Sequence, residues 1–120
     1  MDIGNNDSEV PKENPLIKKL EGRKDDQDKL RYDLIPVQPL EELVKVYTLG
    51  AKKYGDRNWE KGINFSRIFA AMMRHAWAYW KGEKYDTKDG QHHLASVAWN
   101  AFALMEFDNT HPELNDRKKC

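Results

Sequence analysis

Every aromatic side chain of this 120-residue chain lies between Tyr32 and Phe107, and this confinement limits where a core can form. The four Trp, five Tyr and four Phe are absent from both ends of the chain. Residues 1–28 and residues 108–120 are rich in charge instead, so they cannot bury enough apolar surface to offset the entropy of ordering. We therefore predict a folded domain at residues 29–107 between a flexible N-terminal segment and a flexible tail.

The balance of positive and negative residues bears on which molecules the protein could bind. Twenty Lys and Arg offset 20 Asp and Glu, so the formal net charge is zero. A protein that coats nucleic acid or lies on a membrane surface usually has a basic excess, so neither partner is expected. The single cysteine, Cys120, allows no internal disulfide. Neither a secretory signal nor an apolar stretch of ~18 residues is evident, so we expect a soluble, cytoplasmic protein.

Apolar residues recur at helical spacing in three segments of the aromatic-rich region. A first helix is expected to begin near Pro39 and to end at Gly55. A second is expected from Ser66, which suits an N-cap, to Gly82, and a third over about residues 91–107. No strand-like alternation competes with them. The pattern predicts an all-α fold of three main helices in a small bundle.

The third segment is apolar nearly all round, and a helix of this kind must be covered on most sides. Two other helices of a small chain provide little cover, and so small a core is marginal by itself. We therefore predict a homo-oligomer, with a dimer as the simplest case. The alternative is a compact monomer whose flanking segments fold back over the bundle.

Polar residues interrupt these apolar helices. Arg74 and His75 lie midway along the second helix, and His93 and Asn100 lie on the third. Burying such a group costs about 1–3 kcal/mol unless it finds a partner. If the two helices are antiparallel neighbours, His75 should face the level of Ser96 and Asn100, and Tyr79 should face His93. A lone buried histidine is more often structural, but the group as a whole indicates an interior polar slot.

The connection between these helices adds carboxylates. Glu83 and Asp86 are three residues apart, and paired carboxylates suit Mg²⁺ or Mn²⁺. We predict two layers in the slot: Glu83 and Asp86, with His93, at its mouth, and His75 with Asn100 deeper. The alternative for the carboxylates is a solvated turn in which Asp86 caps the backbone.

The loop after the first helix contains residues suited to phosphate and base. Lys53 and Arg57 can contact phosphate oxygens, Asn58 can hydrogen-bond a base edge, and Tyr54 can stack on a base. The alternative is a helix cap followed by a tryptophan that anchors the loop. For Trp59 we favour the anchor.

Four motifs occur in one order along the predicted domain. They are residues 29–36 (KLRYDLIP), residues 50–55 (GAKKYG) with Asn58-Trp59, Arg74-His75 with Gly82-Glu83 and Asp86, and His93-Leu94-Ala95 with Asn100. In order and spacing they resemble the phage-associated dATP/dGTP diphosphohydrolase N-terminal domain family, which is related to MazG-like all-α nucleotide pyrophosphatases. The resemblance implies metal-dependent hydrolysis of dGTP or dATP to the monophosphate and pyrophosphate, in the host cytoplasm if the protein is phage-encoded.

The resemblance and the residues together suggest roles. Glu83 and Asp86 would hold Mg²⁺ or Mn²⁺, and His93 or His75 would orient or deprotonate the attacking water. Catalytic and substrate contacts are further assigned to Arg74, Lys53, Tyr54, Arg57, Asn58 and Asn100. One alternative function is a nucleotide-sensing or protein-interaction module without turnover. Another is a structural protein whose polar slot fixes helix register.

Overall fold

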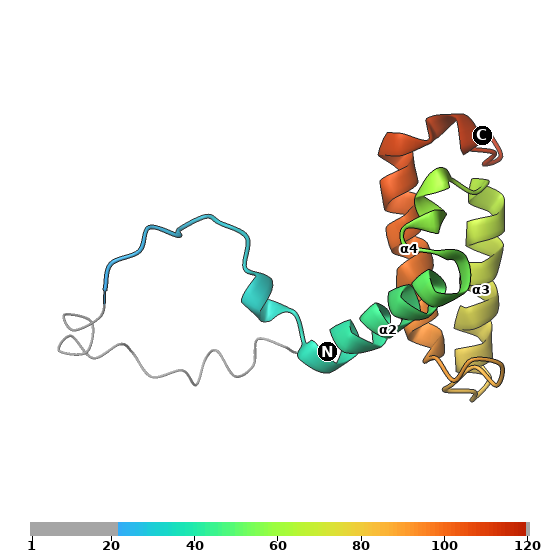
Figure 1. The fold of residues 1–120 in the computed structure, drawn as a ribbon, viewed down its shortest axis with the longest axis horizontal. Helices are drawn as coiled ribbons and strands as arrows, with labels where there is room; N and C mark the ends of the chain where they lie inside the picture. Colours follow the sequence, from blue (N-terminus) through green and yellow to red (C-terminus); the bar gives the residue numbers. More distant parts are fainter. Residues whose placement is uncertain (1–21, 120) are drawn as a thin grey trace. The chain divides into compact units, whose positions relative to one another are not determined.

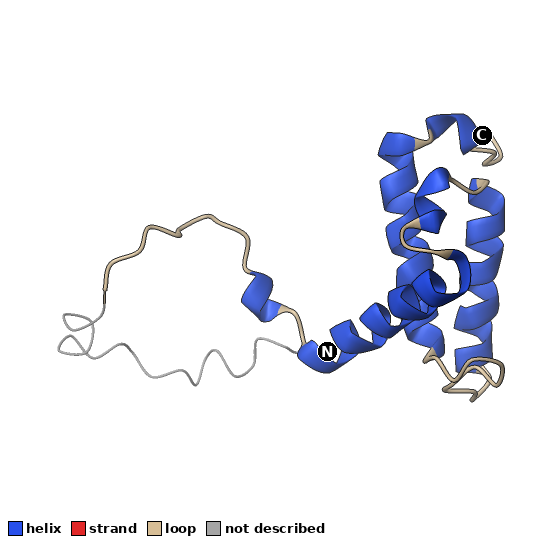
Figure 2. Cartoon of the chain, in the orientation of Figure 1, coloured by secondary structure: helices blue, strands red, loops and turns tan. Residues whose placement is uncertain are grey.

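The computed structural model describes residues 22–119, and the helices in this part of the chain confirm the all-α prediction. The α-helices are α2 (Val37–Tyr54), α3 (Phe65–Trp80) and α4 (His93–Thr110), and the short 3-10 turns are η2 (Tyr32–Leu34), η3 (Asn58–Lys61) and η4 (Pro112–Leu114). No strand occurs over residues 22–119, where an isolated bridge joins Tyr85 and His92 (Figure 2).

The chain divides into two units, residues 1–32 and residues 33–120, and the second contains the three α-helices. Most of the N-terminal segment that was predicted to be flexible, and Cys120, lie outside the described residues. Residues 22–28 are exposed and form no helix or strand. Among the helices that are described, none has the length and apolar character needed to cross a membrane.

Helices α3 and α4 lie side by side and run in opposite directions, and α2 crosses them (Figure 1). The core lies between α3 and α4, where Phe65 and Ile68 pack against Ala103 and Phe107. Phe107 is fully buried. Trp59, from the turn between α2 and α3, packs against the same core. The turn that follows α2 is therefore fixed to the helical pair by a large apolar anchor.

One predicted helix end agrees with the structure and another does not. Gly55 ends α2 as predicted, with φ of 96° and its N–H donating to the carbonyl of Ala51. The predicted N-cap at Ser66 is wrong, because α3 begins at Phe65 and Asn64 takes the cap position. The Ser66 amide and hydroxyl instead donate to the carboxylate of Asp116, over 2.8 and 2.5 Å. A residue 50 positions away thus supplies the side-chain acceptor.

The folded unit extends beyond the predicted boundary at Phe107. Helix α4 continues to Thr110, and the chain then turns back so that Leu114 packs on the core. His111 lies 5.7 Å from Phe107 between ring centroids, and its Nε2 is 2.8 Å from the carbonyl oxygen of Glu60. The start of the tail is ordered because it covers the side chain of Phe107. The charge-rich composition of the tail did not indicate this contact.

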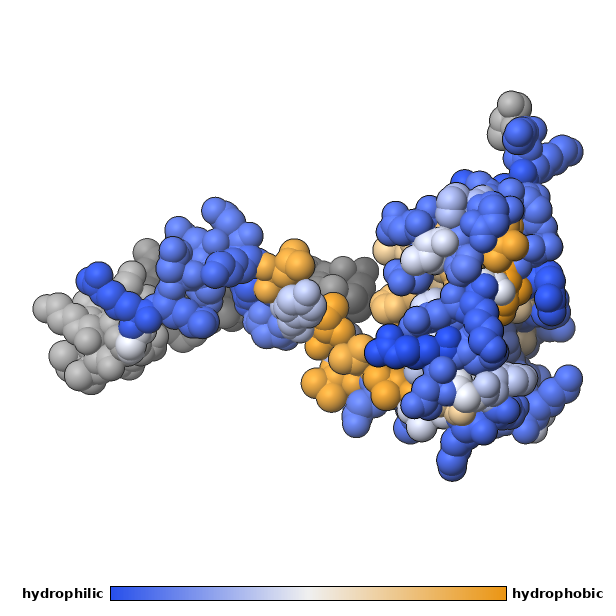
Figure 3. All heavy atoms as spheres, turned by 45° about the horizontal axis from the view of Figure 1, so that its top comes forward, coloured by the Kyte–Doolittle hydropathy of each residue, from blue (hydrophilic) through white to orange (hydrophobic). Residues whose placement is uncertain are grey.

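Apolar side chains also remain exposed on the helices. On α3 they form a stripe of Phe69, Met73, Trp77 and Trp80, and on α4 they are Leu94, Phe102 and Met105. A further hydrophobic group lies where α2 begins (Figure 3), and its exposed residues are Leu34, Ile35, Val37 and Leu40. The expectation that three helices would leave apolar surface uncovered therefore agrees with the structure of this unit.

Candidate functional site

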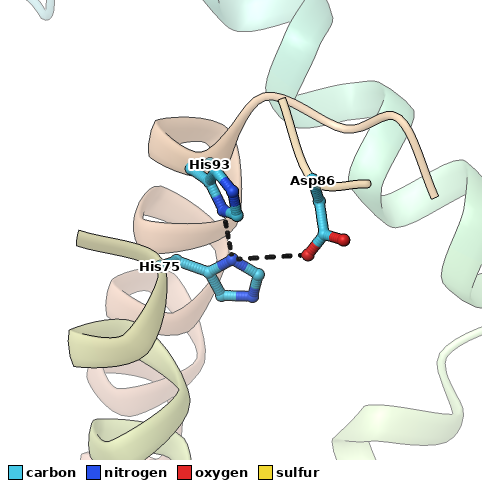
Figure 4. A group of neighbouring side chains, drawn as sticks. All are labelled: His75, Asp86 and His93. Atoms are coloured by element: carbon cyan, nitrogen blue, oxygen red, sulfur yellow. Dashed lines mark hydrogen bonds and ion pairs between the residues drawn. The ribbon is translucent and has the colours of Figure 1, made fainter. Parts of the chain in front are cut away.

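Two histidines and a carboxylate meet where α3, α4 and their connecting loop approach one another (Figure 4). The Nδ1 atoms of His75 and His93 are 2.9 Å apart, and Oδ2 of Asp86 is 3.9 Å from Nδ1 of His75. One ligand atom from each of the three lies within 4.8 Å of the others. His93 is buried, and the other two are half-buried. We call these three residues the His75–Asp86–His93 cluster.

The cluster corrects the predicted two-layer arrangement. The sequence placed His75 with Asn100 and apart from Asp86, but the structure brings His75 against His93, where their ring centroids are 5.1 Å apart. Tyr79, which was expected opposite His93, stacks on His92 at 5.8 Å instead. The register differs because backbone hydrogen bonds close the connecting loop into a turn, and these bonds leave no pattern in the sequence.

Backbone hydrogen bonds in this loop place Asp86. Its N–H donates to the carbonyl of Gln91 over 2.8 Å, and the N–H of His93 donates to the carbonyl of Lys84 over 3.0 Å. The N–H of Lys88 donates to Oδ1 of Asp86 over 2.7 Å. The other carboxylate oxygen is therefore left to face the histidines. Helix α4 begins at His93, at the level that α3 reaches at His75.

Glu83 takes a place behind the cluster, outside its three ligand atoms. Its Oε1 lies 2.6 Å from Nε2 of His93. Because an ionised carboxylate only accepts hydrogen bonds, Nε2 carries the proton, and in the neutral ring the lone pair is then on Nδ1. Glu83 thus turns the free nitrogen of His93 toward His75. The predicted pairing of Glu83 with Asp86 as joint metal ligands is not the arrangement that the structure assembles.

The surroundings keep His75 neutral. Partial burial lowers the pKa of its imidazole below the ordinary value, and the neighbouring His93 lowers it further, against the opposing effect of Asp86 and Asp89. A neutral imidazole has a lone pair to offer, which is the form that binds metal ions. Two imidazole nitrogens and a carboxylate oxygen form a donor set that fits a divalent cation.

A cavity of about 1000 Å³ borders the cluster at His75. Its walls come from the C-terminal half of α2, the loop leading into η3, and the facing sides of α3 and α4. The predicted substrate-binding residues that line it are Lys53, Tyr54, Arg57, Asn58 and Asn100. They share this space with His75, and their roles in binding substrate stay a prediction.

The lining residues differ in what they can still offer. The Tyr54 ring is 69% exposed. Arg57 pairs with the carboxylate of Glu60 over 3.1 Å at the surface, a contact that a phosphate could replace. Asn100 is buried and donates from its side-chain amide to the carbonyl of Ser96 over 2.7 Å. The amide oxygen of Asn100 and its second N–H are therefore what it can offer to a ligand.

Trp59 is an anchor, as favoured from the sequence. Its ring lies 6.1 Å from Tyr47, 6.0 Å from Trp99 and 5.8 Å from Phe107 between centroids. Rings packed at such distances stabilise one another through edge and tilted contacts. Because Trp59 is engaged in these ring contacts, Tyr54, the last residue of α2, is the exposed ring beside the loop that can stack on a base.

The arginine of α3 that lines the cavity is Arg67, and Arg74 lies elsewhere. Arg67, which the sequence analysis missed, lines the cavity with Ala71 and His75, since residues four apart share one face of a helix. Arg74, predicted to be catalytic, lines a separate shallow pocket with Trp77. Adjacent residues of a helix point in different directions, so Arg74 and His75 open on different surfaces. The spacing of Arg67 from His75 was the available signal.

Comparison with known proteins agrees with the predicted resemblance. Residues 19–117 match the family described as dATP/dGTP diphosphohydrolase, N-terminal. The chain belongs to this family. A protein of Salmonella phage PMBT28 named dATP/dGTP diphosphohydrolase is 32% identical over 99 residues, which are 82% of this chain. The match spans 34% of that relative, so the chain corresponds to about a third of its length. No solved structure matches the chain.

Proposed function

We propose that this domain hydrolyses a purine deoxynucleoside triphosphate, dGTP or dATP, to the monophosphate and pyrophosphate with a divalent cation. The observation that carries the proposal is the cavity that joins cationic side chains of α2 and α3 to the His75–Asp86–His93 cluster. Membership of the family and the printed name of the phage relative support the substrate class.

The cationic side chains suit the triphosphate. Lys53, Arg57 and Arg67 all line the cavity, and each can donate charge-assisted hydrogen bonds to phosphate oxygens. Arg67 and His75 are eight residues apart on one face of α3, which is about 12 Å along the helix. We therefore place the reacting phosphate near His75 and the rest of the phosphate chain toward Arg67.

The loop after α2 suits the base. Tyr54 offers an exposed ring for stacking, and Asn58 has both a donor and an acceptor for a base edge. Both line the same cavity as the cationic side chains. Purine recognition is thereby assigned to Tyr54 and Asn58. Trp59 holds the loop in place by packing against the core.

The cluster suits the divalent cation. When bound, such a cation polarises a phosphate and activates water. His75, Asp86 and His93 would hold it, so neither imidazole serves as the base, in contrast to the role suggested from the sequence. Asp89 lines the cavity and lies close enough to His75 to influence its pKa.

We assign the proton of the attacking water to Asp89. Its Oδ1 accepts a hydrogen bond from the N–H of Gln91 over 2.9 Å, which holds the carboxylate in place. In the proposed step, the water oxygen bonds to the α-phosphorus and the water proton moves to Oδ2 of Asp89. The bond from the α-phosphorus to the bridging oxygen breaks, and pyrophosphate leaves with its electron pair.

A nucleotide panel tests the function. Purified protein is incubated with each common deoxynucleoside triphosphate and with Mg²⁺ or Mn²⁺, with and without EDTA, and the products are identified. We expect pyrophosphate and dGMP or dAMP, and no product with EDTA. Absence of product from every nucleotide would overturn the proposal. Thermal stabilisation by nucleotide without product would indicate a binding module instead.

We infer in addition that a second copy of the chain covers the exposed stripe of α3. Phe69, Met73, Trp77 and Trp80 are spaced at four, four and three residues, so they share one helix face. Light scattering with size-exclusion chromatography should give a dimer for the natural chain and a monomer for Trp77→Glu. A monomeric mass for the natural chain at all concentrations would refute the dimer.

A further inference from the structure

We propose that the His75–Asp86–His93 cluster is a mixed nitrogen–oxygen centre that binds a borderline transition-metal dication, such as Co²⁺ or Zn²⁺, in preference to Mg²⁺. Glu83 is its positioning residue, acting through His93. The inference rests on the proposed function only for the role that the bound cation would have. The donor atoms themselves are described by the structure.

The identity of the donors separates these cations. Mg²⁺ and Mn²⁺ prefer oxygen ligands, and Mg²⁺ keeps several waters, whereas imidazole suits later transition metals such as Co²⁺ and Zn²⁺. Two of the three ligand atoms here are the Nδ1 nitrogens of His75 and His93. Two imidazoles with one carboxylate also leave coordination positions open for a substrate or water. An oxygen-only site made from Glu83 and Asp86 would have had the opposite preference.

The spacing of the ligand atoms fits a common ion. Ligands held ~2.1 Å from a metal lie about 3.0 Å apart at right angles and about 3.4 Å apart at tetrahedral angles. The two Nδ1 atoms are 2.9 Å apart, and the distance from Nδ1 of His75 to Oδ2 of Asp86 is 3.9 Å. The two nitrogens are thus at coordination distance already. The carboxylate of Asp86 must move inward, by about half an ångström to close its distance to His75 alone, from a set whose three ligand atoms lie within 4.8 Å of one another.

The environment of His93 prepares it for this role. His93 is 3% exposed, and Glu83 accepts a hydrogen bond from its Nε2, 2.6 Å away. A metal-bound histidine typically donates its other N–H to a carboxylate in this way, which fixes the ring and its tautomer. In the absence of a cation, the two facing Nδ1 atoms need a shared proton, so His75 donates to His93. If a cation binds, the His75 proton moves from Nδ1 to Nε2 by exchange with water, and both Nδ1 lone pairs then face the cation.

Cobalt is the most informative probe, because nitrogen ligands and low coordination number intensify its visible absorption. The 120-residue chain is stripped with EDTA, dialysed and titrated with Co²⁺, and the visible bands and the melting temperature are recorded. Mn²⁺, Zn²⁺ and Mg²⁺ are then added as competitors. His75→Asn, Asp86→Asn and Glu83→Gln are compared with His92→Asn. The last is the matched control, because Asn can retain the N-cap hydrogen bond that His92 accepts from the N–H of Leu94.

We expect visible bands and a raised melting temperature with Co²⁺, displacement by Zn²⁺, and no displacement by millimolar Mg²⁺. Glu83→Gln should weaken Co²⁺ binding by about 10- to 100-fold, as loss of such an outer carboxylate does elsewhere. His75→Asn and Asp86→Asn should abolish the bands, and His92→Asn should retain them. Circular dichroism melts of each variant without metal verify that it is folded.

Three results would overturn the inference: no visible bands with Co²⁺, displacement of Co²⁺ by an equal concentration of Mg²⁺, or bands that survive in His75→Asn. The proposed function has a separate readout. Hydrolysis of dGTP with Mg²⁺ by a chain that lacks the cobalt signal would refute the centre and keep the function. A cobalt signal in a chain that hydrolyses no nucleotide would keep the centre and refute the function.

Discussion

Replacing Arg67 by Gln should weaken the use of dGTP without weakening metal binding. Arg67 lines the cavity two helical turns from His75, at the end where the phosphate chain is proposed to lie. A hydrogen bond to a charged group contributes about 1.5–3 kcal/mol, and the exposure of Arg67 to solvent places it at the lower end. About 1.5 kcal/mol corresponds to a roughly tenfold loss in kcat/KM, seen mainly as a higher KM, because the contact exists before and during reaction.

Arg74→Gln is the matched control, since Arg74 lies on the same helix and lines a different pocket. Steady-state pyrophosphate release is measured for both variants, and Co²⁺ titrations verify that the cluster is intact. We expect Arg74→Gln to keep the natural KM for dGTP. A normal KM in Arg67→Gln together with an impaired Arg74→Gln would refute the assignment and restore the role of Arg74 that the sequence suggested.

Three further predictions concern the C-terminal segment and the core. Phe107→Ala should lower the free energy of unfolding by about 3–5 kcal/mol in urea titrations, because the side chain is fully buried; a loss under 1 kcal/mol would contradict its role. Gly62→Ala should lower the free energy of unfolding by about 1–3 kcal/mol, because φ is +100° and the new Cβ would lie 2.6 Å from a methyl group of Leu114. Gly50→Ala is the control, because its Cβ meets open space in α2 and should not lower the free energy of unfolding. Hydrogen bonds to Glu113 and a backbone carbonyl raise the pKa of His111 above 6.5, so the stability that it contributes is complete below pH 6.5 and is lost as the pH rises through the raised value; His111→Gln should remove this pH dependence from melting curves.

The helices were predictable because their signals are local. Gly55 ends α2 at the predicted position, and Trp59 anchors its loop as expected, because a glycine at positive φ and a large apolar ring act within a few residues of the chain. The acceptor for Ser66 was not predictable, since Asp116 reaches it from a distant part of the sequence. The order of the C-terminal segment follows from the same kind of long-range contact.

The residues of the candidate site could be identified from the sequence, but their arrangement in space could not. His75, His93 and Asp86 were all identified as candidates, but their register depended on a turn whose closure rests on backbone hydrogen bonds. Backbone hydrogen bonds of this kind carry no side-chain signature. Glu83 was identified as a ligand because its type and spacing suit one, whereas its contact with His93 is visible only in three dimensions.

The most direct test of the central claim is a crystal structure of the 120-residue chain with Mn²⁺ and a non-hydrolysable dGTP analogue, measured at a wavelength where manganese scatters anomalously. We predict an anomalous peak bound by His75, Asp86 and His93, with the phosphate chain running toward Arg67 and the base against Tyr54. A manganese peak away from both histidines, or a nucleotide bound outside the cavity, would contradict the proposed site.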